Sequence, residues 1–457
     1  MDFYPHENPH ISHTNENVHD ANSIHTRKLK INLMYAPITE FRPKIFNIGN
    51  AAISFELKIP GYDDIYGGGV LDSQGILSKS VKLTERNTNT KQSFSFFSGP
   101  KITGAITLFL SGEHVTISEG IKESVKPGDP SDRDDYLTNR FDDVKYVIPI
   151  NIAYDDNDNE IPIKYTFNGV QEKFSKISNK YIFGYVILNY VSIYITKLGY
   201  DRVGIVHAIV QKDNPSGTYS NNYRQSIILL DNDNVWLPST ILHEYGHHVM
   251  FSAGFYGMKS AGGDHFFCDP AQKNQDLMWT EGYATGFSLV MMDELELKHK
   301  DLGTSMNPYL NWRDGKEHWH QNLEYYYCDI ADVELDEGRI AALIYDLYDG
   351  RKDSVDDTLV PKIMKDKKLR GKTTIQKEYF GDSNYKDDNE GSKITPYQLL
   401  IASMMDGYTG LFPYLTSILN SVKENQVHLQ KTCRTFLYNK MPMWMLISCQ
   451  SIPIPNN

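Results

Sequence analysis

The first part of the chain alternates between apolar and polar positions with a period of two. In residues 52–59, Ile53, Phe55, Leu57 and Ile59 fall on one face, which is the pattern of a half-buried β-strand. Similar short apolar segments recur, with turn-forming residues between them, at 93–97, 105–110 and 114–118. A series of short strands at this spacing predicts a β-sandwich over residues 31–125.

Two neighbouring stretches lack this pattern. Residues 1–30 are polar, rich in Asn and His, and without periodicity, which predicts a disordered tail. Residues 126–140 are acidic and contain Pro127 and Pro130, which predicts a solvated linker. Its carboxylates could bind Ca²⁺, but their spacing differs from that of an EF-hand loop, so a calcium site is the weaker interpretation.

The pattern changes after about residue 141. Two more strands are predicted at 146–152 and 161–167. The long apolar segment 174–198 then predicts a helix, which Gly199 is expected to end.

Two buried strands are expected next, at 202–210 and 226–230, followed by a helix that Pro238 can open. Beyond about residue 395 the chain is expected to be mostly helical. We therefore predict an α+β fold, in which a second domain over residues 141–457 combines a small sheet with a mainly helical C-terminal part.

Charge and composition narrow the classes of partner. The chain has 457 residues and a formal net charge of −12, which argues against general nucleic-acid binding. No run of about 18 apolar residues occurs, so no membrane-spanning helix is expected. Residues 1–25 lack the basic-then-apolar order of a signal peptide. The sequence therefore leaves the location of the protein open, and its oligomeric state as well.

The four cysteines are widely separated, and no C-x-x-C pair occurs; they are Cys268, Cys328, Cys433 and Cys449. This spacing is typical neither of a disulfide scaffold nor of a cysteine zinc site. We expect free buried thiols, with one disulfide, for instance between Cys268 and Cys328, as the alternative.

The strongest chemical signal lies in residues 241–250, where His243, Glu244 and His247 follow the spacing H-E-x-x-H. On a helix, positions four residues apart share one face. The two imidazoles can therefore point at one zinc ion. Glu244 is placed to act as a general base toward water at that ion.

A catalytic zinc usually has three protein ligands. A third histidine at the metzincin spacing is excluded, because that position is Ala253. The candidate third ligand is Glu281, which lies 34 residues after His247 in a segment that Thr280 is expected to cap as a helix. The small residues around it should let this helix approach the first one closely; they are Gly282, Ala284 and Thr285.

Together these motifs resemble the gluzincin metallopeptidases, which include thermolysin-like proteases and zinc aminopeptidases. More closely, the chain resembles secreted prokaryotic zincin domains that read H-E-Y-G-H-H and then W-x-E-G-x-A. Two further stretches, at 321–324 and 336–349, are similar to segments of that group. The resemblance covers about residues 170–360 and implies a zincin-like catalytic domain with one Zn²⁺ held by His243, His247 and Glu281. More loosely, the N-terminal region resembles a sandwich domain appended to such peptidases.

One position departs from the thermolysin-like pattern. In those enzymes an aspartate four residues after the glutamate ligand holds the first histidine, whereas here that position is Thr285. Since a ligand histidine normally needs such a partner to fix its tautomer, another carboxylate is expected to serve. The candidates are Asp346, Asp336 and Glu324.

The donor that stabilises the oxyanion is not identified by any motif. Candidates lie between the glutamate helix and the next predicted helix, and one lies in a preceding loop. They are His318, His320, Tyr325, Tyr326, Tyr327 and His265. His248 points to another helix face and is interpreted as structural.

The sequence favours a zinc endopeptidase. The strand at 226–230, with Ile227 and Leu229, could form the edge of a cleft and pair with an extended peptide. No G-x-M-E-N signature for binding a free amine is present, so an aminopeptidase is the weaker hypothesis. Two alternatives remain, namely a non-catalytic zincin-fold binding or cell-surface module and a zinc hydrolase of non-peptide amides.

Overall fold

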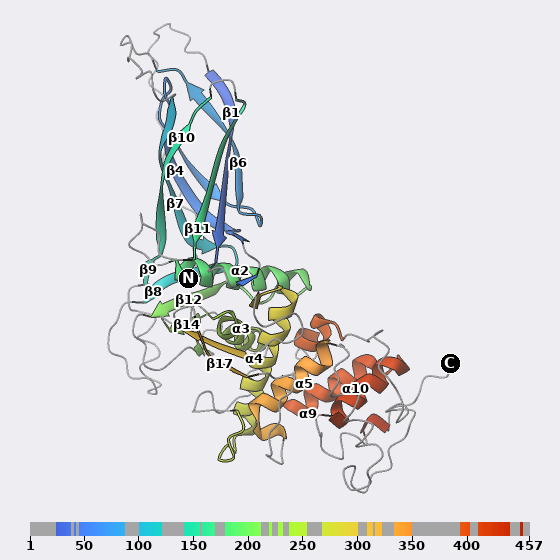
Figure 1. Ribbon diagram of the computed structural model, residues 1–457. Helices are drawn as coiled ribbons and strands as arrows, with labels where there is room; N and C mark the ends of the chain where they lie inside the picture. The colour runs from blue at the N-terminus through green and yellow to red at the C-terminus, as the bar shows by residue number, and fades with distance from the viewer. Residues whose placement is uncertain are drawn as a thin grey trace.

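The computed structural model shows a mixed α/β molecule in which strands dominate the first 170 residues and helices dominate the rest. Figure 1 shows long strands on one side of helix α2 and the later helices on its other side. The structure describes residues 24–37, 41–42, 45–86, 100–120, 141–155, 158–169, 179–211, 219–221, 227–231, 237–253, 267–299, 309–313, 316–321, 333–349, 394–402, 410–438 and 448–450.

The strands of residues 24–168 are called the strand region below. They are β1 (Ile24–Ala36), β2 (Phe41–Arg42), β3 (Phe46–Asn47), β4 (Ala51–Lys58), β5 (Ile65–Val70), β6 (Ile76–Thr84), β7 (Lys101–Gly112), β8 (Val115–Gly120), β9 (Phe141–Asp143), β10 (Lys145–Ala153) and β11 (Glu160–Asn168).

The remainder of the chain contains most of the helices. Its elements are α2 (Lys180–Lys197), β12 (Val206–Gln211), β13 (Tyr219–Asn221), β14 (Ile227–Asp231), α3 (Pro238–Ser252), α4 (Gln275–Glu294), β15 (Lys298–His299), β16 (Tyr309–Arg313), β17 (Lys316–Gln321), η3 (Val333–Leu335), α5 (Glu337–Asp349), η4 (Gln398–Ala402), α9 (Leu411–Val422) and α10 (Gln426–Tyr438).

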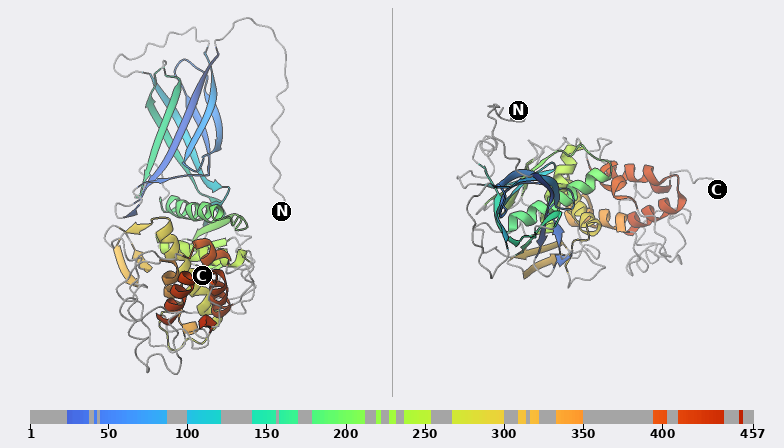
Figure 2. Two further views of the ribbon diagram at one scale, coloured as in Figure 1. Left: turned by 90° about the vertical axis from the view of Figure 1, so that its right-hand side faces the viewer. Right: turned by 90° about the horizontal axis from the view of Figure 1, so that it is seen from above.

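Two sheets organise the strand region. In the first, β1 pairs with β11 in parallel and with β6 and β3 in antiparallel fashion. The second has nine strands, with the order β13-β14-β12-β8-β7-β4-β5, while β10 pairs with β7 and β9 with β8. In Figure 1 and in the left view of Figure 2, the long strands extend together away from α2. The second sheet thus runs from the strand region into the later half of the chain.

The predicted alternation is present in these strands. Along β4, Ile53, Phe55 and Leu57 are buried while the residues between them are partly or fully exposed. Apolar side chains of β1, β4 and β7 belong to one buried cluster. Burial of this apolar area is the main favourable term that holds the strands together.

The prediction of a disordered tail over residues 1–30 is wrong for residues 24–30, which form the first half of β1. The sequence of these residues looks polar because this half of the strand is mostly exposed. Their backbone nevertheless pairs with both β6 and β11. Residues 1–23 lie outside the described residues, and so does the predicted linker 126–140.

The boundary predicted near residue 141 separates strands that the structure pairs. Lys145–Ala153 lies antiparallel to β7, and Glu160–Asn168 lies parallel to β1. Parallel pairing requires a long connection between the partners, so the sequence pattern alone could not join β1 to β11. The division into domains is otherwise a prediction that the structure leaves open.

Helix α2 connects the strand region to the later helices. The Tyr185 hydroxyl and the Asn189 amide both donate to the backbone carbonyl of Gly49, at 3.2 and 3.1 Å. On the α3 side, the Tyr245 hydroxyl donates to Ser192 at 3.2 Å. Gly199, with φ +94°, follows the end of α2 as predicted.

The cysteines differ from the expectation of free thiols. Cys433 on α10 is disulfide-bonded to Cys449, and Cys268 is disulfide-bonded as well. Both Cys433 and Cys449 are fully buried. Sequence spacing missed this bridge because the two cysteines are brought together by the fold of the C-terminal helices, 16 residues apart.

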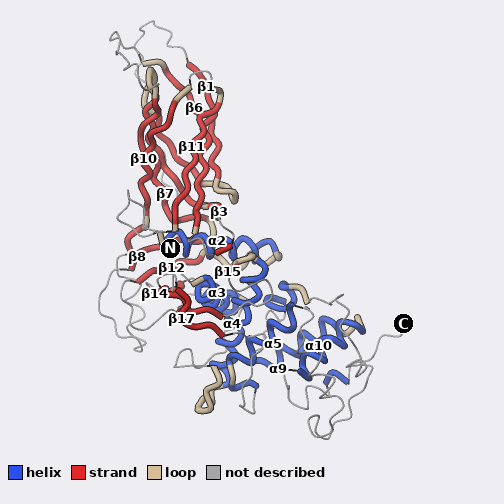
Figure 3. The backbone as a smooth tube through the Cα atoms, in the orientation of Figure 1, coloured by secondary structure: helices blue, strands red, loops and turns tan. Residues whose placement is uncertain are grey.

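The later helices lie side by side below the strands, as the tube view shows (Figure 3). Within the described part of the chain, none of the helices combines the length and the apolar character needed to cross a membrane.

Candidate metal centre

Helix α3 carries the H-E-x-x-H residues. It begins at Pro238, whose fixed φ and missing N–H suit the first turn of a helix. Thirteen of its fifteen residues are buried, so this helix has no broad solvent face. His243, Glu244 and His247 are all buried, and polar residues in such a position need partners.

Helix α4 carries the predicted third ligand, Glu281. The helix begins at Gln275, and the Asn274 side chain caps it by accepting from the backbone N–H of Leu277 at 3.1 Å. The prediction that Thr280 caps this helix is therefore wrong. Thr280 lies inside the helix, where its hydroxyl donates to the carbonyl of Asp276.

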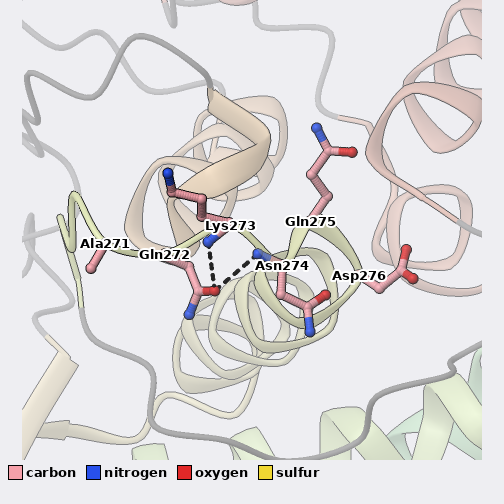
Figure 4. A pocket seen from close by; sticks show the side chains of 6 residues that line it. All are labelled: Ala271, Gln272, Lys273, Asn274, Gln275 and Asp276. Atoms are coloured by element: carbon pink, nitrogen blue, oxygen red, sulfur yellow. Dashed lines mark hydrogen bonds between the residues drawn. The ribbon is translucent and has the colours of Figure 1, made fainter.

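The capping loop of α4 also borders a hollow lined by Ala271, Gln272, Lys273, Asn274, Gln275 and Asp276 (Figure 4). The Gln272 side-chain oxygen accepts from the backbone N–H groups of Lys273 and Asn274. This hollow lies at the start of α4, while Glu281 lies further along the helix, so the two features are separate.

Small residues allow three helices to approach closely. A Cβ added at Gly246 of α3 would lie 3.0 Å from the Cα of Ala284 on α4. A Cβ added at Gly282 would lie 2.6 Å from the Cβ of Ile340 on α5. The small residues of α4 were all predicted to let it approach α3, but Gly282 instead lets α4 pack closely against α5.

The side chains of His243, His247 and Glu281 converge. Glu281 Oε2 lies 3.0 Å from Nε2 of His243 and 3.1 Å from Nε2 of His247. The two Nε2 atoms are themselves 3.1 Å apart. These residues form a group that could hold a metal ion.

The chemistry of this donor set fits a cation. Two imidazole nitrogens and a carboxylate oxygen are all acceptors when deprotonated, and at these distances their lone pairs repel unless a cation lies among them. Ligands that share a tetrahedral Zn²⁺ at bond lengths of about 2.0–2.1 Å lie roughly 3.3 Å from each other. The observed separations of 3.0 and 3.1 Å are close to this value.

Two other α3 residues have distinct surroundings. Glu244 is buried beside His243, with 5% of its surface exposed. His248 lies on another face, and its Nε2 donates to the carbonyl of Val203 at 2.8 Å. This contact agrees with the structural role predicted for His248.

Thr285 occupies the place where a carboxylate partner for His243 was expected. Its Oγ1 lies 2.9 Å from Nδ1 of His243 and donates to Oε1 of Glu337, also at 2.9 Å. Sequence reasoning missed Glu337, although it lies inside the segment 336–349 that resembles zincin relatives. No local signal connects it to Thr285, which is 52 residues earlier.

Two of the predicted carboxylate partners lie elsewhere in the same region. Asp336 accepts from the backbone N–H groups of Cys268 and Gly338, and so caps the start of α5. Asp346 is half-buried further along α5. Glu324, the third candidate, lies outside the described residues.

The predicted substrate-edge strand is corrected by its pairing. β14, which contains Ile227 and Leu229, pairs with β12 on one side and with β13 on the other. Both of its sides are therefore occupied over this stretch. β13 is the last strand in the order of the described sheet, and the edge lies there.

The predicted oxyanion donors are only partly placed. His318 and His320 belong to β17, which pairs with β16, and their side chains lie outside the described part of the structure. Tyr325, Tyr326, Tyr327 and His265 also lie outside the described residues. Their role stays a prediction.

Residues 202–396 match the family model described as the mycolysin C-terminal domain. The match covers less than half of the 457 residues, and it includes His243, His247, Glu281 and Glu337. No curated protein and no solved structure matches the chain. The similarity links this part of the chain to a metallopeptidase family, and the metal-binding group lies within it.

Proposed function

We propose that this protein is a zinc metallopeptidase that cleaves within peptide chains. The observation that carries the proposal is the convergence of Nε2 of His243, Nε2 of His247 and Oε2 of Glu281, with no pair more than 3.1 Å apart. Glu244 follows the first of these ligands on the same helix, which is the arrangement that metal-assisted hydrolysis requires.

The similarity to the mycolysin C-terminal domain supports a peptidase rather than another use of the metal. We further propose that the later half of the chain has a zincin-like architecture of gluzincin type. The strand region would then be a β-sandwich placed before it. The pairing of β8 with β12 supports a fixed junction between the two parts.

The residues of the site divide the chemistry between them. Zn²⁺ bound by His243, His247 and Glu281 would supply a Lewis acid that polarises a peptide carbonyl and acidifies water. Glu244 would accept the proton of the attacking water and return it to the leaving nitrogen. Burial of Glu244 keeps bulk water from competing for that proton.

The outer edge of β13 is the proposed position for the substrate backbone. β13 runs antiparallel to β14 and contacts α3. An extended peptide that pairs there would gain main-chain hydrogen bonds beside the metal centre. Such binding does not need a free terminus, and it therefore favours an endopeptidase.

We also propose that the protein works in an oxidising compartment. Cys268, Cys433 and Cys449 are disulfide-bonded, and disulfides persist mainly in exported proteins. This agrees with the secreted zincin domains that the sequence resembles.

The test combines metal analysis with proteolysis of the full chain. Zinc is measured by elemental analysis, and cleavage of casein is compared for wild type, Glu244→Gln and His247→Ala. Glu113→Gln, an exposed residue in the turn between β7 and β8, is the matched control. We expect one zinc per chain in wild type, and a loss of cleavage of about 10²–10⁴-fold in Glu244→Gln.

Two outcomes would contradict this function. Stoichiometric zinc without cleavage of any unfolded protein would favour a zincin-fold binding or cell-surface module. Absence of zinc from wild type, together with unchanged behaviour of His247→Ala, would eliminate the metal centre.

A further inference from the structure

His243 is held at both ring nitrogens. Nε2 points to the cluster that contains Glu281, while Nδ1 lies 2.9 Å from the Thr285 hydroxyl. The same hydroxyl lies 2.9 Å from Oε1 of Glu337. His243, Thr285 and Glu337 are 5%, 0% and 4% exposed, so water does not compete strongly for these contacts.

The protons on this chain of contacts can be assigned. A threonine hydroxyl has one proton, and an ionised carboxylate can only accept a hydrogen bond. The Thr285 proton is therefore directed to Glu337. The Thr285 oxygen must then accept from His243, which places the imidazole proton on Nδ1 and leaves the Nε2 lone pair for a metal.

Glu337 lies at the N-terminal end of α5. It is the first residue of α5, and the N-terminus of a helix stabilises anions through its dipole and its unpaired N–H groups. Asp336 already accepts from the N–H of Gly338 at this helix end. The Glu337 carboxylate of α5 is therefore linked to His243 of α3 through the Thr285 hydroxyl of α4.

We propose that Thr285 and Glu337 are positioning residues that fix the tautomer and orientation of His243 for metal binding. This inference rests on the proposed metal centre, and it adds α5 to the parts of the fold that determine metal affinity. Without Glu337, the Thr285 hydroxyl is free to donate to Nδ1, which selects the tautomer with its proton on the metal-facing nitrogen.

The experiment measures the affinity of the full chain for Zn²⁺ alone, by competition with a chromophoric chelator. We expect Thr285→Val and Glu337→Leu each to weaken zinc binding by about 10–100-fold. Thr285→Ser keeps the hydroxyl and should bind zinc like wild type. Glu337→Gln keeps an acceptor without the charge, and its affinity should lie between those of wild type and Glu337→Leu.

A double variant and a matched control separate positioning from general stability. Thr285→Val combined with Glu337→Leu should bind zinc no more weakly than either single variant, because both break the same relay. Ser288→Ala removes another buried hydroxyl between α4 and α3, where Ser288 donates to the carbonyl of Ser239. It should lower the melting temperature of the metal-free chain and leave zinc affinity unchanged.

The visible spectrum of the Co²⁺-loaded chain gives a readout that a structural role would not change. Rotation of His243 in Thr285→Val should shift the ligand-field bands, whereas Ser288→Ala should not. Wild-type zinc affinity in both Thr285→Val and Glu337→Leu would overturn the relay and leave the metal centre intact. Failure of wild type to bind zinc would instead overturn the proposed function itself. If Thr285→Val does not fold, as judged by circular dichroism, the Glu337 series decides.

Discussion

The strand region and the helices α3 and α4 distribute polar residues in different ways. Along β10 the buried and exposed positions alternate, so about half of this strand is in contact with water. In α3 thirteen of fifteen residues are buried, and in α4 sixteen of twenty. A polar residue in the strand region therefore faces solvent by default, whereas one in α3 or α4 needs a specific partner.

This difference shows where substitutions should matter. Exposed strand positions lose little when a side chain is changed. Among the described residues, α3 and α4 have few exposed positions, because most of their side chains are buried. The following predictions test this contrast, from the largest expected effect to the smallest.

The largest effect is expected at Phe287, which is fully buried on α4 and contacts the rings of Tyr245 and Tyr283. Phe287→Ala should lower the free energy of unfolding by about 3–5 kcal/mol through lost burial and a cavity. Tyr66→Ala on β5, at a residue that is 66% exposed, should change it by less than about 0.5 kcal/mol. Urea unfolding measures both, and equal effects would contradict the contrast.

Gly282 tests how closely α4 and α5 must pack. Gly282→Ala should cost about 1–3 kcal/mol, because the new Cβ would lie 2.6 Å from the Cβ of Ile340. Thermal unfolding of the metal-free chain measures this loss. Glycine at the opposing position removes the Cβ and Cγ2 atoms that the new side chain would meet, so adding Ile340→Gly to Gly282→Ala should cost less than the sum of the single variants. Strict additivity would show that the helices move apart instead.

Alkaline pH should destabilise the protein through its buried tyrosines. Burial raises the pKa of Tyr245, Tyr283, Tyr414 and Tyr35 above the ordinary value. Their neutral forms therefore stabilise the fold below about pH 10, the unfolded pKa. This contribution is lost as pH rises above 10, by up to about 1.4 kcal/mol per pH unit for each such tyrosine. Absorbance at alkaline pH should show these tyrosines ionising only as the chain unfolds.

The smallest effect comes from one substitution made in both regions. The Tyr283 hydroxyl donates to the carbonyl of Leu400 at 2.6 Å, so Tyr283→Phe should cost about 0.5–1.5 kcal/mol. The Tyr35 hydroxyl in β1 is buried without a hydrogen-bond partner among the described residues, so Tyr35→Phe should be neutral or slightly stabilising. Urea unfolding decides the sign, and a loss at Tyr35 as large as that at Tyr283 would contradict it.

Much of the local structure could be predicted because its signal is local. The alternation at Ile53, Phe55 and Leu57 identifies β4, and the spacing of His243 and His247 is meaningful only on a helix. Glu281 could be proposed from its small neighbours, and the structure brings it to the two histidines. In each of these cases a few adjacent residues determine the geometry.

The missed features all depend on distant parts of the chain. Glu337 meets Thr285 only because Gly282 lets α5 approach α4. Strand β13 pairs antiparallel with the edge of β14. Because this pairing uses backbone atoms, the apolar pattern of the sequence does not predict it. Cys433 lies on α10 and pairs with Cys449, which lies beyond the end of that helix. Contacts of this kind follow from packing, and a periodicity cannot reveal them.

The parallel pairing of β12 with β8 has a consequence for synthesis of the chain. The N-terminal strands leave the ribosome first, and parts of a chain generally fold in that order. β8 is then available as an edge before β12 emerges, and the first strand of the metal-binding half adds to it. The β1–β11 pair must also wait until residue 168 has been made. The strand region thus acts as a folding template, and residues 202–457 expressed alone should aggregate through the uncovered edge of β12.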